Sequence, residues 1–272
     1  MVFSVLGEIA RTALRRATGG SDTSPCPVCT GDARILGEVN FNKSCEGRDD
    51  IPLPKSNAMI RYYVCSGCGF CFAPEFRKWS DRKFKARIYN DDYVLVDPEY
   101  VATRPEGTAK FIGDVFGPVR ERITHLDYGG GNGLMSQRLR AGGWQSSSYD
   151  HFANGPGQLA QLSTYDLVTA FEVFEHVVDP LQLMASLSKL THAQSLIVFS
   201  TLLSEGHIAC DKGLDWWYLA PRNGHISLFS EKSLTHLLGA YGYRVHHVND
   251  GLHLAFRELP AWSHEVSIFG SI

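Results

Sequence analysis

The chain lacks the features that mark membrane-spanning, secreted or nucleic-acid-binding proteins. None of its apolar runs approaches the roughly 20 residues that a transmembrane helix needs. The apolar stretch Val2–Leu6 is short, and Glu8 and Arg11 follow it at once, unlike a secretory signal. The formal net charge is only −3 and no basic run is present, so nucleic acid is not expected as a partner. These absences predict a globular cytoplasmic protein without a transmembrane segment.

A disulfide framework is also not indicated by the cysteines. The seven cysteines are an odd, unevenly spaced set, which favours metal binding. Cys26, Cys29, Cys65 and Cys68 form two C-x-x-C units separated by 35 residues. Each unit can present two thiolates to one tetrahedral ion, so the pair predicts a closed, structural Zn²⁺ site. The alternative is two pairs of free thiols. The three remaining cysteines are expected to be ordinary thiols; they are Cys45, Cys71 and Cys210.

Composition and breaks divide the chain into four parts. Residues 1–20 are predicted to form an amphipathic helix, ended by Gly19-Gly20, that docks on the protein itself or on a second subunit. A homodimer is therefore one expectation. Residues 25–75 are predicted to form a loop-rich zinc-binding module, residues 76–122 a helical connector, and residues 123–260 a larger domain.

Alternating strand and helix patterns begin at residue 123. Short apolar or alternating runs predict strands at Ile123–Leu126, Ser146–Tyr149, Asp166–Phe171 and Leu196–Ser200. Helices are predicted over Leu134–Arg140, over Pro180–Leu190 and after a cap at Ser230. Asp250-Gly251 separates Tyr243–Val248 from Leu252–Phe256, which is a hairpin signal. The predicted fold class is α/β, a doubly wound Rossmann-like sheet that ends in an antiparallel hairpin.

A glycine-rich loop follows the first of these strands. Gly129, Gly131 and Gly133 alternate with other residues, and Asp127 precedes them by two positions. This spacing does not satisfy the G-x-G-x-x-G pattern of dinucleotide-binding loops. Asp150 ends the second strand, where a carboxylate can accept hydrogen bonds from both hydroxyls of an adenosine ribose. Asp150 alone could equally cap a helix.

In combination, these residues resemble the class I S-adenosylmethionine-dependent methyltransferases. The resemblance is carried by Asp127–Gly133, by Asp150, by Tyr165–Val168, and by Glu172–Pro180, which is similar to an E-V-x-E-H-x-x-x-P signature in that family. It covers roughly residues 105–258.

This resemblance implies that S-adenosylmethionine is the cofactor. It implies that Asp127 and the glycines line the methionine end of the cofactor, that Asp150 holds the ribose, and that Glu172 lies beside the cofactor. His151, next to Asp150, is included among the cofactor-binding candidates.

The chain departs from the family in one interval. Only 15 residues separate Asp150 from Asp166, where family members fit a third strand and a residue for the adenine. A shorter match joins Pro52-Leu53 with the segment Cys65–Phe70, which is similar to the N-terminal zinc module of sugar C-methyltransferases.

Methyl transfer to a hydroxyl or an acidic C–H requires a general base. His176 follows Glu172 by four residues and is the first candidate, since the two would share one side of a helical turn. His225 is the second, in the aromatic segment 216–230, which is predicted to form a lid together with Arg222. The alternatives are a histidine that only packs the turn and a loop packed by its own aromatic residues. Glu172 completes the candidate catalytic set.

Three functional classes are compatible with these features. The first is a methyltransferase acting on a small-molecule acceptor, a carbohydrate or nucleotide-sugar. The second is a methyltransferase that recognises a protein or RNA through the zinc module. The third is a non-catalytic scaffold that retains the fold. The intact Asp127, glycine loop and Asp150 favour the first two classes, and the mild negative charge disfavours RNA.

Overall fold

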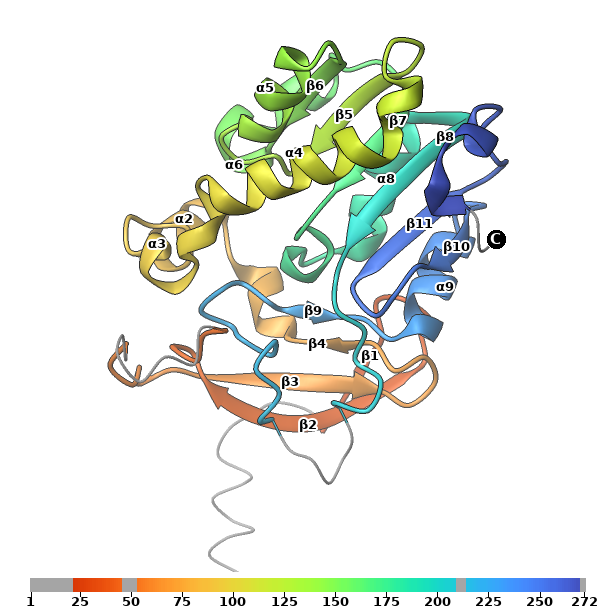
Figure 1. Cartoon of the computed structure of the whole chain (residues 1–272). Helices are drawn as coiled ribbons and strands as arrows, with labels where there is room; N and C mark the ends of the chain where they lie inside the picture. The colour runs from red at the N-terminus through yellow and green to blue at the C-terminus, as the bar shows by residue number, and fades with distance from the viewer. Residues whose placement is uncertain (1–21, 46–52, 209–213, 270–272) are drawn as a thin grey trace, which may run out of the picture.

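The computed structural model describes residues 22–45, 53–208 and 214–269. Two sheets account for the architecture (Figure 1). The predicted N-terminal helix lies outside the described residues, as does Cys210. Within the described residues, no helix has both the length and the apolar character needed to span a membrane.

The larger sheet has six strands in the order β10-β11-β8-β7-β5-β6. Strands β5, β6, β7 and β8 are parallel, and β11 and β10 form an antiparallel hairpin at one edge. The strands are β5 (Thr124–Tyr128), β6 (Gln145–Tyr149), β7 (Tyr165–Ala170), β8 (Thr191–Ser200), β10 (Arg244–His247) and β11 (Leu252–Phe256). The predicted α/β sheet and its terminal hairpin are therefore confirmed.

Helices cover both faces of this sheet because successive strand side chains point to opposite sides. Leu167 and Val198 pack with helices α4 (Thr103–Phe116) and α5 (Leu134–Ala141). Val168 and Phe199, each one position along its strand, pack with α8 (Pro180–Lys189) and α9 (Glu231–Gly239). The predicted cap is present, since Ser230 accepts a hydrogen bond from the Ser233 backbone. The sheet is thus doubly wound.

The interval between β6 and β7 holds two short helices and no strand. They are α6 (His151–Asn154) and α7 (Pro156–Leu159). Strand β6 is consequently the edge of the sheet. Its polar run Ser146–Ser148 suits an edge strand, which has a sheet neighbour on one side only. The missing third strand that the sequence indicated is confirmed.

The smaller sheet is antiparallel and is more regular than the loop-rich module that the sequence predicted. Its order is β1-β2-β3-β4-β9, with β1 (Thr23–Pro25), β2 (Asp32–Asn40), β3 (Met59–Cys65), β4 (Cys71–Phe72) and β9 (Ser227–Leu228). A bulge between Ile35 and Gly37 interrupts the two-residue alternation of β2, which hid the strand from a pattern search. Strand β9 comes from the far end of the chain, so the small sheet is completed by the C-terminal half.

The connector between the sheets is helical. It contains η1 (Pro74–Lys78), α2 (Asp81–Arg87), α3 (Tyr93–Val96), η2 (Pro98–Tyr100) and η3 (Gly117–Val119), in addition to α4. Short 3₁₀ turns η4 (Phe174–His176), η5 (Ser263–Glu265) and η6 (Ser267–Phe269) complete the described elements. Helices α2 and α3 lie beside the carboxyl end of the parallel sheet (Figure 1).

Candidate active site

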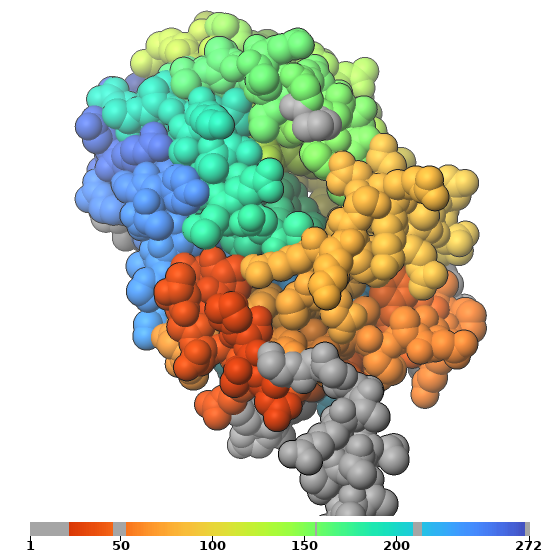
Figure 2. Space-filling model, turned by 180° about the vertical axis from the view of Figure 1, so that it is seen from behind, coloured from red at the N-terminus to blue at the C-terminus, as the bar shows by residue number. Residues whose placement is uncertain are grey.

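A cavity of about 760 Å³ opens where the parallel strands end. In open α/β sheets, ligands bind in this crevice at the carboxyl ends of the strands. The view from behind shows the surface hollowed where the connector, the α5–α7 region and the segment after β7 meet (Figure 2). The sequence-predicted residues that line the cavity are Asp127, Gly129, Gly131, Asp150, His151, Glu172 and His176.

The glycine loop is tightly packed at one end and open at its centre. Gly129, Gly131 and Gly133 have φ values of +79°, +54° and +75°, a region that favours glycine. A Cβ at Gly129 would lie 2.4 Å from Cγ2 of Val173, whereas a Cβ at Gly131 would meet nothing within 4 Å. The loop therefore packs tightly against the segment after β7 and leaves its backbone at Gly131 open to a ligand.

Asp127 lies beneath this loop at the end of β5. It is 4% exposed, and it accepts a hydrogen bond from the Thr169 hydroxyl at 3.3 Å. Burial raises the pKa of Asp127 to about 7, and the Thr169 hydrogen bond offsets only part of this shift. A buried carboxyl group that lines the cavity is suited to bind a cationic group such as an ammonium.

Asp150 joins the end of β6 to both α6 and the glycine loop. Its Oδ1 accepts hydrogen bonds from the backbone of Phe152 at 2.8 Å and of Ala153 at 2.9 Å. Its Oδ2 accepts one from the Gly131 backbone at 3.2 Å. Asp150 is thus a helix cap, the alternative open at the sequence level, and it also faces the cavity. Neighbouring His151 pairs with Asp81 of α2 at 2.9 Å, so this contact ties the connector to the cavity rim.

Glu172 follows β7 in a strained backbone conformation. Its φ is +52°, which is uncommon for a residue with a side chain and is concentrated at functional sites. The Glu172 backbone N–H donates to Oγ of Ser200 at 2.8 Å, and the Ser200 hydroxyl donates to Oε1 of Glu172 at 2.9 Å. Ser200 thereby holds the carboxylate at the cavity wall.

His176 lines the cavity, but not for the reason inferred from the sequence. Only Phe174–His176 is helical, as the 3₁₀ turn η4, and Glu172 lies before it with positive φ. The expected shared helical face is therefore wrong, because the backbone reverses between β7 and η4. The Nδ1 atom of His176 lies 3.3 Å from the Tyr89 hydroxyl. Burial, followed by the nearby Arg104 charge, lowers the pKa of His176 to about 4.

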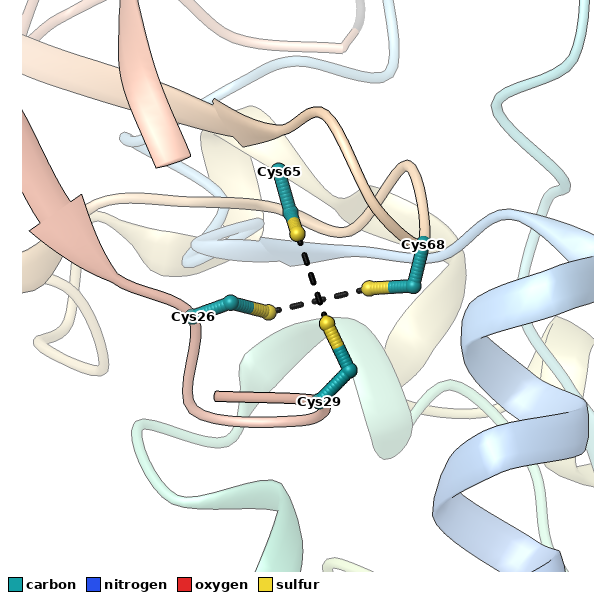
Figure 3. Close-up of side chains that lie close together, drawn as sticks. All are labelled: Cys26, Cys29, Cys65 and Cys68. Carbon is teal, nitrogen blue, oxygen red and sulfur yellow. Dashed lines mark hydrogen bonds between the residues drawn. The ribbon is translucent and has the colours of Figure 1, made fainter. Parts of the chain in front are cut away.

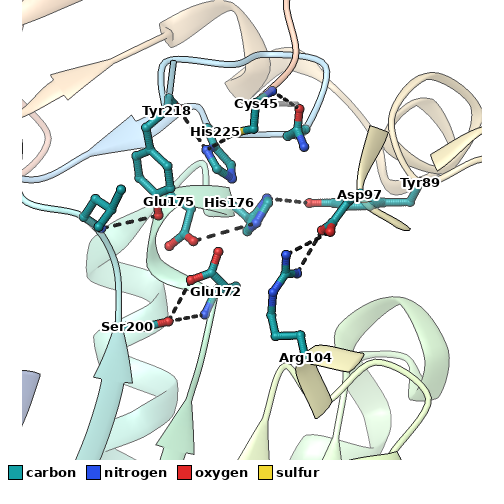
Figure 4. A network of polar contacts seen from close by, with 12 residues as sticks. Cys45, Tyr89, Asp97, Arg104, Glu172, Glu175, His176, Ser200, Tyr218 and His225 are labelled. Atoms are coloured by element: carbon teal, nitrogen blue, oxygen red, sulfur yellow. Dashed lines mark hydrogen bonds and ion pairs between the residues drawn. The ribbon is translucent and has the colours of Figure 1, made fainter. Parts of the chain in front are cut away.

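The segment that was predicted to be a lid is an internal spacer. Residues 218–230 are buried, and the Arg222 guanidinium donates to the Ile88 carbonyl at 2.8 Å. His225 lies behind His176, outside the cavity lining, with the two ring centroids 4.9 Å apart (Figure 4). Burial lowers the pKa of His225 to about 3. The lid prediction is wrong because this segment fills the space between the two sheets. Its aromatic residues pack in the interior.

Sequence reasoning missed several groups around the cavity. The Arg104 guanidinium forms two hydrogen bonds with the Asp97 carboxylate, at 2.9 and 2.8 Å, and both residues line the cavity. The Tyr89 hydroxyl lies beside Nδ1 of His176, and the Glu175 carboxyl group lies beside Nε2 of the same ring. No local pattern marks the connector residues, because their approach to the sheet depends on how the connector folds back.

The four cysteines of the two C-x-x-C units come together beside β4 and α9 (Figure 3). The Sγ atoms of Cys26 and Cys68 are 3.6 Å apart, those of Cys29 and Cys65 are 3.4 Å apart, and all four lie within 4.8 Å of one another. Sulfur ligands at about 2.3 Å from a tetrahedral zinc ion would be about 3.8 Å apart. The donor set and its spacing therefore fit zinc.

The chain was compared with protein-family models, curated proteins and solved structures. A family model described as "Methyltransferase domain" matches residues 100–248, more than half of the 272-residue chain. Among solved structures, the magnesium protoporphyrin IX methyltransferase of Synechocystis PCC 6803 with bound SAH is 16% identical, with 57% of this chain and 83% of that chain covered and a TM-score of 0.42. A SAM-dependent methyltransferase from Archaeoglobus fulgidus is 20% identical, with coverages of 57% and 76% and a TM-score of 0.41. No curated protein matches the chain.

Proposed function

This chain belongs to a methyltransferase-domain family, and from that premise we propose that it transfers the methyl group of S-adenosylmethionine to a small-molecule acceptor. The observation that carries the proposal is the cavity of about 760 Å³ in which the glycine loop, Asp127 and Asp150 meet Glu172 and His176. One end of this cavity has the features of a cofactor site, and the other has groups able to contact an acceptor.

The cofactor would occupy the end of the cavity next to β5 and β6. There, Asp127 would accept hydrogen bonds from the cofactor's ammonium group, and the open backbone at Gly131 would approach it. Asp150 would hold the ribose, with His151 beside it. The cofactor supplies the methyl group on a sulfonium leaving group, while the protein positions the two reactants.

The acceptor would occupy the end of the cavity next to the connector. We propose a carbohydrate, since this end combines aromatic faces with the polar groups of the Asp97–Arg104 pair. The aromatic residues that line the cavity include Tyr89, Tyr93, Tyr100 and Phe171. Glu172 and His176 face this space, and His225 supports His176 from behind. We propose that these three residues activate the acceptor.

Replacing Asp150 with asparagine tests the cofactor assignment. Asparagine is as good a helix cap as aspartate, so α6 should persist while the negative charge is lost. Loss of charge-assisted hydrogen bonds should weaken S-adenosylhomocysteine binding about 10- to 100-fold in calorimetry. Asp114→Asn, an exposed change on α4, is the matched control and should bind normally. Unchanged binding by Asp150→Asn would remove the ribose role.

We propose that Cys26, Cys29, Cys65 and Cys68 hold one structural zinc ion. Four thiolates close the tetrahedron and leave no open position for catalysis. The site is joined to the catalytic half, since the Ser230 hydroxyl that caps α9 also donates to the Cys68 carbonyl at 2.5 Å. The zinc would therefore stabilise the contact between the two sheets.

Metal analysis should find a tightly held zinc ion in the wild type that Cys68→Ser loses. The melting temperature should fall at the same time, because a structural zinc contributes directly to folding. Cys71→Ala is the control: Cys71 is a fully buried cysteine of β4 that is not in the cluster, so this variant should lose stability but retain zinc. A stable, metal-free wild-type protein would contradict the assignment.

A further inference from the structure

Three side chains of types that can bind metal ions meet at the cavity wall, where His176 lines the cavity and the other two lie behind it. They are Glu175, His176 and His225, and one ligand atom from each lies within 4.8 Å of the others. Figure 4 shows their side chains pointing toward one another. Glu175 and His176 come from η4, and His225 comes from the buried spacer, so the tertiary structure creates this group.

The Glu175 carboxyl group is buried without a well-formed hydrogen bond or a close ion pair. It is 0% exposed, and neither oxygen has a hydrogen-bond partner of normal geometry among the residues that the structure describes, although the Tyr218 and Thr201 hydroxyls lie nearby. The nearest ion-pair contact is Nε2 of His176, at 4.0 Å from Oε1. Buried carboxylates are normally hydrogen-bonded, paired with a cation or bound to a metal. The two oxygens of Glu175 are therefore available to bind a cation.

Both histidines present a ring nitrogen to the same space. Nδ1 of His225 lies 2.8 Å from the Tyr218 carbonyl, which can only accept, so Nδ1 carries the proton and Nε2 has a free lone pair. Nδ1 of His176 contacts the Tyr89 hydroxyl, and its Nε2 faces Glu175. Histidines that bind metals are typically oriented by such contacts from the other ring nitrogen.

We propose that Glu175, His176 and His225 bind a divalent transition-metal ion in the cavity wall. Two imidazoles and one carboxylate form a ligand set that suits Zn²⁺, Mn²⁺ or Fe²⁺ and leaves coordination positions open. Ligands about 2.1 Å from an ion are about 3.4 Å apart, so the three side chains would close slightly around it. The unusual φ of Glu172 places a second carboxylate beside the group, which adds to its negative field.

The position of the ion would define the class of acceptor. Because His176 and Glu172 line the cavity, the open coordination positions would face the acceptor end. A bound cation there acts as a Lewis acid on an oxygen ligand. This inference rests on the proposed function, and it names an oxygen-bearing acceptor, such as a hydroxyl group, as the ligand that completes the site.

Titration with Mn²⁺ monitored by electron paramagnetic resonance tests the site without an acceptor. Mn²⁺ prefers nitrogen and oxygen ligands, so it should leave the zinc-loaded four-cysteine site untouched. We expect one Mn²⁺ to bind per chain. Glu175→Gln and His225→Asn should each weaken binding at least about tenfold, because each removes one of three ligands. Glu205→Gln and His264→Asn, both exposed changes, should bind as the wild type does.

Two outcomes would overturn the metal site. The first is a wild-type protein that binds no Mn²⁺ and also holds no Zn²⁺ beyond the cysteine-bound ion. The other is binding that both ligand variants retain while circular dichroism shows them folded. His176→Gln provides a third variant should His225→Asn not fold. S-adenosylhomocysteine calorimetry on the same samples separates this failure from that of the proposed function, since cofactor binding does not require the ion.

Discussion

Asp127→Asn should abolish most cofactor binding and yet stabilise the unliganded protein at pH 8. The side chain is almost fully buried, and burial raises its pKa to about 7. Above that pH the wild type holds a desolvated negative charge that only a cationic ligand can balance. The asparagine variant lacks this charge, so S-adenosylhomocysteine should bind at least about 100-fold more weakly.

The pH dependence of stability follows from the direction of the shift. The unfolded-state pKa of an aspartate is about 3.9, so the folded protein binds the proton more tightly than the unfolded chain does. The stability contributed by protonated Asp127 is fully present below about pH 4 and is lost as the pH rises through 7. Thermal unfolding should therefore show the wild type losing stability relative to Asp127→Asn between pH 5 and pH 8.

Cofactor affinity should rise with pH over the range in which the stability of the unliganded protein falls. Binding by the wild type requires ionised Asp127, so affinity should rise with pH up to about 7 and then level off, with a limiting slope of about tenfold per unit. The asparagine variant should show no such rise. A flat wild-type profile between pH 5.5 and 8 would show that Asp127 does not pair with the cofactor.

Asp166→Asn is the matched control, because the pKa of Asp166 is lowered whereas that of Asp127 is raised. Burial alone would raise the pKa of Asp166, but hydrogen bonds from Thr124 and His192 outweigh it and lower the pKa. A lowered pKa stabilises the folded state above the unfolded-state value. Asp166→Asn should thus reduce stability at pH 8 and, since Asp166 lies outside the cavity lining, leave cofactor binding unchanged.

His176→Asn should remove most turnover while leaving cofactor affinity nearly intact. His176 lines the cavity beside Glu172, where we place the acceptor. Loss of an activating group should lower the turnover number by about 10²- to 10⁴-fold. The measurement is release of S-adenosylhomocysteine with the identified acceptor, alongside calorimetry with the cofactor product.

The control for His176 is His264→Asn, which changes an exposed histidine and should leave both quantities unchanged. Equal losses of binding and turnover in His176→Asn would mean that the side chain only supports the pocket. Full activity would shift the catalytic assignment to His225. A companion variant, Tyr89→Phe, should reduce turnover less than His176→Asn does, because it removes only the hydroxyl that contacts Nδ1.

The sequence by itself determined the fold class and most of the cofactor end. Apolar runs such as Asp166–Phe171 identify strands because buried parallel strands need side chains that are apolar on both faces. The glycine loop, Asp127 and Asp150 fall at the strand ends, and parallel strands bring those ends to one edge. The 15-residue interval after Asp150 likewise leaves no room for a further strand. The strands, the glycine loop and the short interval are each recognisable from residues close together in the sequence, and the general rule for parallel sheets places the strand ends together.

Only the tertiary structure decided the acceptor end. His225 proved to be internal because Tyr62, 163 residues earlier, donates to its carbonyl and fixes the spacer between the sheets. Asn223 is held in the same way by the Cys45 backbone, 178 residues away. Nothing in the E-V-F-E-H segment reveals that Glu175 is buried without a well-formed hydrogen bond, since that depends on what packs over η4. Burial, pKa shifts and the Glu175–His176–His225 group arise from contacts between distant segments, which local periodicity does not encode.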